Sequence, residues 1–94
     1  MKGYRWDLDK NELLKEERAI SFEEVLLAIE RGDLLDIVEH PNRSKYPSQR
    51  MFVVLIRHYV YLVQFVLVQF VENNREIFLK TIIPSRKATR DYLK

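Results

Sequence analysis

The fold of this chain is decided at residues 51–71, which read MFVVLIRHYVYLVQFVLVQFV. The stretch has the length of a membrane-spanning helix, but Arg57 and His58 interrupt it near its middle, and its longest uncharged piece, Tyr59–Val71, has 13 residues. Valine and aromatic residues dominate it, and these side chains favour strands. The stretch therefore predicts two strands of a buried sheet. One covers residues 50–57, a turn follows at the Arg-His pair, and the other continues to the end of the stretch.

The second of these strands contains a five-residue unit twice without a gap, LVQFV at Leu62–Val66 and again at Leu67–Val71. Side chains alternate between the two faces of a strand, and five is odd, so the second unit points each equivalent residue to the opposite face. Two interpretations stay open. The one we favour is a strand buried on both faces, with a bulge that absorbs the odd residue. The other is an overlong strand, residues 60–71, that pairs with another copy of the chain as a homodimer, since strands usually have about 5–6 residues.

The other elements follow from patterns on either side of this stretch. Ser21 and Glu24 form a capping box that starts a helix, and Gly32 ends it. In chain order we expect a short strand around Tyr4 and Trp6, helices over residues 9–18 and 21–31, strands over 34–39, 50–57, 60–71 and 77–83, and a short helix over 86–93. Consecutive strands with short connections predict a mostly antiparallel sheet. The fold class is α+β, a single small domain over residues 1–94 with two N-terminal helices and a short C-terminal helix.

Length and composition exclude several classes of protein. A chain of 94 residues forms one domain, and 47% hydrophobic with 32% charged residues excludes a disordered or low-complexity chain. The absence of cysteine excludes disulfides, iron–sulfur clusters, cysteine-based zinc sites and a cysteine nucleophile. His40 and His58 lack the spacing of a metal motif, so we expect neither a metal nor another cofactor. The polar N-terminus lacks the apolar core of a signal peptide, which predicts a cytoplasmic protein.

The net charge of +2 hides a division along the chain. Residues 1–40 carry 6 Lys or Arg and 11 Asp or Glu, a net charge of −5, whereas residues 41–94 carry 10 and 3, a net charge of +7. The C-terminal half is therefore expected to attract a polyanion or an acidic protein.

Basic residues of this half are the candidates for chemistry. Arg50 opens a strand, and Lys80 lies inside an apolar strand. That lysine must face solvent, a cleft or a partner, because an unpaired buried ammonium is too costly. Arg86, Lys87 and Arg90 follow at the junction between the last strand and the last helix. A capped helix start with guanidinium groups suits an anion.

Such groups can cleave RNA without a metal. Attack of the 2′-hydroxyl on phosphorus builds negative charge on the equatorial oxygens, which Arg and Lys stabilise, while a Tyr, a Lys or a carboxylate moves protons. Two other interpretations stay open. Basic patches occur on any small charged protein, and the charge pattern alone favours that explanation over catalysis. His40 and His58 are a candidate acid–base pair, which we rank below a pre-proline histidine and a solvated turn histidine.

Four segments, by their order and spacing, resemble the BrnT family of toxins. They are YRWDLDK at 4–10, ISFEEV at 20–25, Arg50 at a strand start, and TIIPSRKAT at 81–89. The family pattern is Trp-Asp-x-x-Lys, then His-Gly-Val-Ser-Phe-Glu-Glu, then Ile-Ser-Ala-Arg-x-Ala-Thr. The resemblance covers nearly the whole chain. It implies a RelE-like fold and the toxin half of a type II toxin–antitoxin pair, an endoribonuclease that cleaves RNA and stops translation. It also implies a partner, a small DNA-binding BrnA-like antitoxin that covers the toxin and represses the operon.

The resemblance places the family's basic strand-start residue at Arg50 and the arginine of its final motif at Arg86. Lys80 and Lys45 are added on physical grounds as proton or phosphate partners. The expected catalytic residues are Arg50, Lys80 and Arg86, the expected RNA- or phosphate-binding residues are Lys45, Lys87, Arg90 and Tyr92, and Tyr46 is a further, weaker candidate.

Three departures from the family pattern keep a second function open. The family's His-Gly is Arg18-Ala19 here, the acidic residue that often precedes the strand-start arginine is Gln49, and the repeated LVQFV unit lies in the central sheet. The alternative is a non-catalytic toxin-fold module that binds an antitoxin or nucleic acid.

Overall fold

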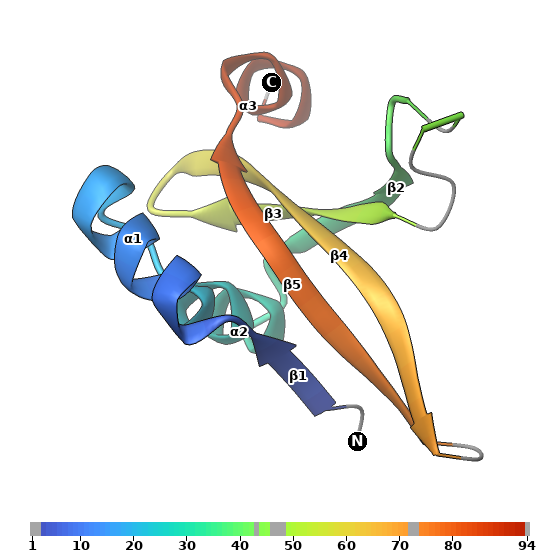
Figure 1. Ribbon diagram of the computed structural model, residues 1–94. Coiled ribbons are helices and arrows are strands. Elements are labelled where there is room, and N and C mark those ends of the chain that lie inside the picture. Colours follow the sequence, from blue (N-terminus) through green and yellow to red (C-terminus); the bar gives the residue numbers. More distant parts are fainter. Residues whose placement is uncertain (1–2, 43, 46–48, 72–73, 94) are drawn as a thin grey trace.

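The computed structural model describes residues 3–42, 44–45, 49–71 and 74–93. The elements in chain order are β1 (Gly3–Trp6), α1 (Leu8–Arg18), α2 (Phe22–Glu30), β2 (Leu34–Glu39), β3 (Arg50–Ile56), β4 (Tyr59–Val71), β5 (Asn74–Pro84) and α3 (Arg86–Tyr92), as Figure 1 shows. Every predicted element is present. The predicted fold class, an α+β domain with two N-terminal helices and a short C-terminal helix, is confirmed.

The five strands form one sheet in the order β1-β5-β4-β3-β2. Only β1 runs parallel to its neighbour, and the other pairs are antiparallel. Helices α1 and α2 pack on one face of the sheet and α3 on the other (Figure 1). We call these the helix-pair face and the α3 face. No helix in the described part of the chain is long and apolar enough to cross a membrane. Residues 51–71 form most of β3, the turn at Arg57 and His58, and β4, as predicted.

The main core lies between the sheet and the helix pair. Phe22 of α2 is fully buried, and its ring lies 5.7 Å from that of Trp6, centroid to centroid. Phe52 and Phe65 stack on neighbouring strands with their centroids 4.0 Å apart. A smaller cluster on the α3 face joins Val53, Val60 and Ala88. Both faces of the central strands are thus buried near α3.

A buried asparagine fixes the corner between α1 and α2. Asp7 caps α1, and Asn11 lies one turn later with 2% of its surface exposed. The Asn11 Oδ1 atom accepts a hydrogen bond from the backbone N–H of Phe22 at 2.8 Å, and its Nδ2 atom donates to Glu23 Oε1 at 2.8 Å. Ser21 Oγ accepts from the Glu24 N–H at 3.2 Å, as the capping box predicts. The start of α2 is therefore tied to the preceding helix.

The chain leaves α1 through Ala19 in the left-handed conformation, with φ 53° and ψ 40°. This conformation costs an alanine roughly 1 kcal/mol and a glycine almost nothing. Ala19 is also one of the two positions where the BrnT-like pattern has His-Gly. The backbone geometry supplies a structural reason for a glycine there.

Replacing Ala19 by glycine is expected to raise the free energy of unfolding by about 1 kcal/mol, because it relieves this conformation. Urea titration measures the change. The matched control is Ala28→Gly within α2, which we expect to destabilise by about 1 kcal/mol or more, since Ala28 is helical and buried. A loss of stability in the Ala19 variant would contradict the backbone geometry.

The turn between β3 and β4 is the predicted one. Arg57 and His58 both have positive φ, 51° and 65°, which makes a two-residue hairpin turn. The Arg57 guanidinium donates to the Ala19 carbonyl at 2.7 Å and lies 3.0 Å from Glu24 Oε2. The hairpin is thereby fastened to the helix pair.

Register shifts occur along the repeated unit, but the favoured interpretation of a strand buried on both faces is wrong for the second unit, where Leu67 is exposed. The first register shift separates Gln64, paired with Thr81, from Phe65, paired with Leu79. The extra residue there is Lys80, so it belongs to β5 rather than to the repeated strand. A second shift falls between Gln69 and Val71 of β4. Both LVQFV units therefore stay in one continuous strand.

Candidate nucleic-acid interface

The β5 bulge decides which face carries Lys80. Ile82, Leu79 and Ile77 belong to the core on the helix-pair face. In a regular strand Lys80 would share that face with Ile82, because alternate side chains point the same way. The extra residue instead leaves Lys80 exposed on the side of Phe78, with its Nζ atom 5.9 Å from the centroid of that ring. Lys80 therefore lies on the α3 face.

Arg50 lies on the opposite face. It alternates in step with Phe52 of the main core, and it lines a pocket of about 270 Å³ on the helix-pair face together with Tyr4, Phe65 and Leu67. Arg50 is exposed. The structure does not bring Arg50 and Lys80 together, since the sheet lies between them. One phosphate group cannot contact both side chains.

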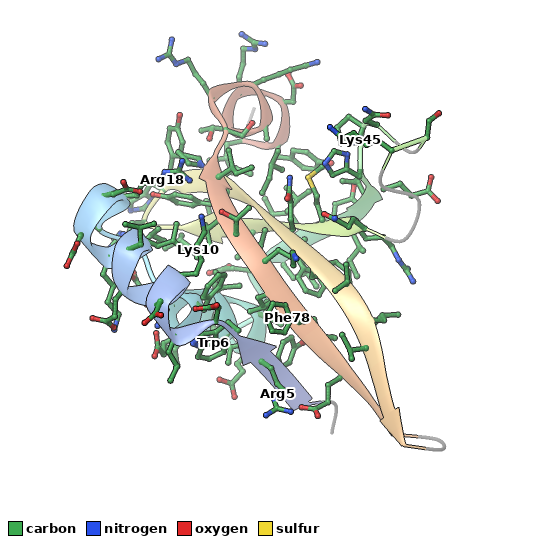
Figure 2. All side chains as sticks on the ribbon, in the orientation of Figure 1. Arg5, Trp6, Lys10, Arg18, Lys45 and Phe78 are labelled. Atoms are coloured by element: carbon green, nitrogen blue, oxygen red, sulfur yellow. The ribbon has the colours of Figure 1, made fainter. Side chains whose placement is uncertain are left out.

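Helix α3 carries the next three candidates. Arg86, Lys87 and Arg90 are all exposed, and nitrogen-tipped side chains of α3 project away from the sheet in Figure 2. Arg86 and Arg90 lie on one side of the helix, being four residues apart. Arg90 Nε lies 3.7 Å from Asp91 Oδ1, whereas no hydrogen bond or ion pair is seen for Arg86 within the described ranges. These cations stand on the same side of the sheet as Lys80.

The other residues of the final motif hold α3 in place. Ser85 Oγ accepts from the Ala88 N–H at 3.0 Å, and the Ser85 N–H donates to the Val60 carbonyl at 3.0 Å. Thr89 Oγ1 accepts from the Val60 N–H at 2.9 Å and donates to the Ser85 carbonyl at 2.7 Å. Ala88 packs against Val53 and Val60. Within this motif Arg86 and Lys87 differ from the other three residues, because neither makes any of these structural contacts.

Removal of the Thr89 hydroxyl tests this attachment. We expect Thr89→Val, which keeps the side-chain shape, to lower the free energy of unfolding by about 1–3 kcal/mol, because the Val60 N–H loses its acceptor. Thr81→Val in β5 is the matched control and should change stability by less than about 0.5 kcal/mol. Equal effects of the two variants in urea titration would show that the hydroxyl does not hold α3.

Tyr92 also has a structural contact. Its hydroxyl donates to Asp36 Oδ2 at 2.8 Å, which joins the end of α3 to β2. This hydrogen bond to the Asp36 carboxylate raises the pKa of Tyr92 above its ordinary value, because it stabilises the protonated phenol. Tyr92 is thus placed to fasten the helix rather than to accept a proton.

His40 and His58 lie at opposite ends of β3. His58 is exposed in the β3–β4 turn, whereas His40 follows β2, beside the start of β3. His40 Nδ1 accepts from the Asn42 N–H at 3.0 Å, and Nε2 lies 3.4 Å from Gln64 Nε2. The neutral ring then carries its proton on Nε2, and the Gln64 amide can turn its oxygen toward it. The two histidines do not form an acid–base pair.

The loop after β2 holds the last candidates. Lys45 is exposed there, and Figure 2 places it beside the β2 end of the sheet. Its backbone N–H donates to Asn42 Oδ1 at 3.3 Å. Tyr46 lies outside the described residues. In the described part of the chain, no group of three or more His, Asp or Glu side chains is arranged to hold a metal ion.

Sequence reasoning missed three contacts that shape this region. They are the Asn11 bridge, the Thr89 hydroxyl and the hydrogen bond from Arg18 Nη1 to the Ile82 carbonyl at 2.6 Å. Each joins residues far apart in the chain, and no local sequence pattern predicts it.

Comparison of the chain with protein-family models and with curated proteins gives no match.

Proposed function

We propose that this chain is a toxin-like, metal-independent endoribonuclease that acts in the cytoplasm, with its RNA site on the α3 face of the domain. The site comprises Lys80 of β5 and Arg86 of α3, with Lys87 and Arg90 as further phosphate contacts. A small DNA-binding antitoxin is the expected protein partner. This proposal keeps the resemblance to BrnT toxins as its starting point.

One observation carries the proposal. In the segment Ser85–Thr89, the serine, the alanine and the threonine are used to attach α3, while Arg86 stands exposed and makes no described polar contact. A guanidinium held at the start of a firmly attached helix is suited to bind a phosphate in two places at once. Structural contacts thus account for Ser85, Ala88 and Thr89, whereas Arg86 and Lys87 remain available to a ligand.

The chemistry requires charge stabilisation above all. The 2′-oxygen of RNA forms a bond to the adjacent phosphorus as its proton passes to a base, and the bond to the 5′-oxygen breaks as that oxygen gains a proton. The products are a 2′,3′-cyclic phosphate and a free 5′-hydroxyl. Lys80 and Arg86 would neutralise the charge on the equatorial oxygens. Arg50 has no part in this step, since it lies on the other face.

Two substitutions test the catalytic assignment. Lys80→Ala and Arg86→Ala are each expected to slow cleavage of single-stranded RNA about 100-fold, because each removes one stabilising cation. Expression of the unaltered chain without a partner should arrest growth, and either variant should relieve the arrest. Lys15→Ala is the control, since Lys15 is an exposed cation of α1, which packs on the opposite face of the sheet. Cleavage products ending in 2′,3′-cyclic phosphate complete the measurement.

A second function, a non-catalytic module that binds nucleic acid, is favoured by a different observation. Arg50 and Lys80 lie on opposite faces, and Tyr92 is hydrogen-bonded to Asp36, so the predicted catalytic and binding residues do not all meet at one place. Binding of nucleic acid through α3 alone predicts that the affinity falls steeply as the salt concentration rises. Replacing Arg86, Lys87 and Arg90 together by alanine should reduce the slope of log affinity against log salt by about 2. Binding with this slope but without cleavage would select the module, and absence of both would reject both functions.

A further inference from the structure

The second LVQFV unit leaves one edge of β4 open. The pairing of β4 with β3 covers Tyr59–Phe65 and stops at Arg50, the first residue of β3. The pairing with β5 continues from Tyr61 to Val71. Among the described strands, β4 beyond Phe65 therefore has a neighbour on one side only. Figure 1 shows this part of β4 and β5 as a hairpin that extends past the rest of the sheet.

Backbone groups point outward along this edge. Val60 directs its N–H and C=O away from β3, toward Thr89 and Ser85. The N–H and C=O groups of successive residues point to alternate sides of a strand. The N–H and C=O groups of Leu67 and Gln69 therefore point toward the side of β3, in the part of β4 that extends past Arg50, the first residue of β3. An unpaired row of this kind is completed best by another strand.

The open edge lacks the features that usually protect a strand edge. Residues 59–71 contain no charged residue and no proline. By comparison, β2 carries Asp36 and Glu39 and a register shift, and β1 has only four residues. Leu67 is 36% exposed, although it is a large apolar residue. Charge, bulges and short length are the common means of blocking association at an edge, and β4 shows none of them between Val66 and Gln69.

We propose that two molecules of this chain form a symmetric dimer by antiparallel pairing of β4 through the open edge of the second LVQFV unit, at Leu67–Gln69. Pairing about a two-fold axis at Val68 sets Leu67 opposite Gln69 of the second molecule and Val68 opposite itself, and it ends before the register shift between Gln69 and Val71. The outward N–H and C=O groups of the two edges then complement one another. No like charges face each other in this register, because the unit is neutral. The same edge of a second molecule has the same length and is also uncharged. This favours a second molecule over an acidic or a basic partner.

The pairing depends on the second unit alone, since the first is enclosed by β3 and β5. Deletion of Leu67–Val71 restores one LVQFV unit and removes the open edge. Gln69→Lys keeps the full length and places one ammonium group of each molecule close to the two-fold axis, diagonally across the strand pair from the other. Gln64→Lys is the matched control, because Gln64 is the equivalent residue of the first unit and pairs on both sides. Circular dichroism confirms that each variant is folded.

Light scattering and sedimentation over a concentration series test the proposal. The unaltered chain should approach twice its 11.4 kDa mass as concentration rises. The deletion variant should stay monomeric, Gln69→Lys should weaken the dimer roughly fivefold or more, and Gln64→Lys should leave it unchanged. A monomer at every concentration would overturn the proposal, as would a dimer that survives both the deletion and Gln69→Lys. The result is independent of RNA cleavage, so the dimer and the ribonuclease proposal can fail separately.

Discussion

Replacing Phe22 by alanine is expected to lower the free energy of unfolding by about 3–5 kcal/mol. Phe22 is fully buried between α1, α2 and the sheet, and its ring packs 5.7 Å from Trp6. Truncation removes its burial and leaves a cavity that the surrounding strands cannot close. The domain is small, so this loss is a large part of its total stability.

Urea titration with Leu27→Ala as control checks this result. Leu27 belongs to the same helix but is 58% exposed, so its truncation should cost less than about 1 kcal/mol. A small effect of Phe22→Ala, similar to that of Leu27→Ala, would mean that α2 does not pack on the sheet through this residue.

Replacing Asn11 by alanine is expected to cost about 2–3 kcal/mol. The substitution removes the acceptor of the Phe22 N–H and the donor to Glu23 in a site with 2% exposure. A buried donor left without a partner costs about 1–3 kcal/mol, and the small cavity adds to this. Glu12→Ala, an exposed neighbour in α1, should change stability by less than about 0.5 kcal/mol.

The pH dependence of stability distinguishes this bridge from simple packing. The hydrogen bond from Asn11 lowers the pKa of Glu23 in the folded state, below its ordinary value near 4.5. The carboxylate therefore stabilises the fold above that pH, and the contribution is lost as the pH falls through the lowered pKa. The unaltered protein should lose more stability than Asn11→Ala between about pH 5 and pH 3. Parallel pH profiles for the two proteins would show that the bond to Glu23 is absent.

The elements could be predicted because each rests on a local signal. The capping box at Ser21 and Glu24, the turn at Arg57 and His58, and the β-branched stretch between them identify helices and strands without knowledge of the fold. Alternation then places a residue on a face, provided that the register is unbroken.

The candidate site could be predicted less well than the fold, because a single bulge moves a side chain from one face of the sheet to the other. Regular alternation from Ile82 would place Lys80 beside the core side chains, on the face of Arg50. The extra residue in β5 turns Lys80 to the other side of the sheet. The repeat in β4 gives reason to expect a bulge, but not that the neighbouring strand supplies it. Contacts such as Asn11 with Phe22 depend on how the helices meet, which no spacing in the sequence encodes.

The parallel pairing of β1 with β5 also constrains the order in which the molecule can fold. Gly3–Trp6 lies against Glu76–Leu79, so the first strand completes the sheet only after most of the chain has been synthesised. Until then β1 has no strand to pair with. Its pairing with β5 must also bring together two segments that are separated by most of the polypeptide. The β3–β4 hairpin, whose contacts are local, can form much earlier on the ribosome. The N-terminal strand is therefore synthesised first and is the last strand to join the sheet.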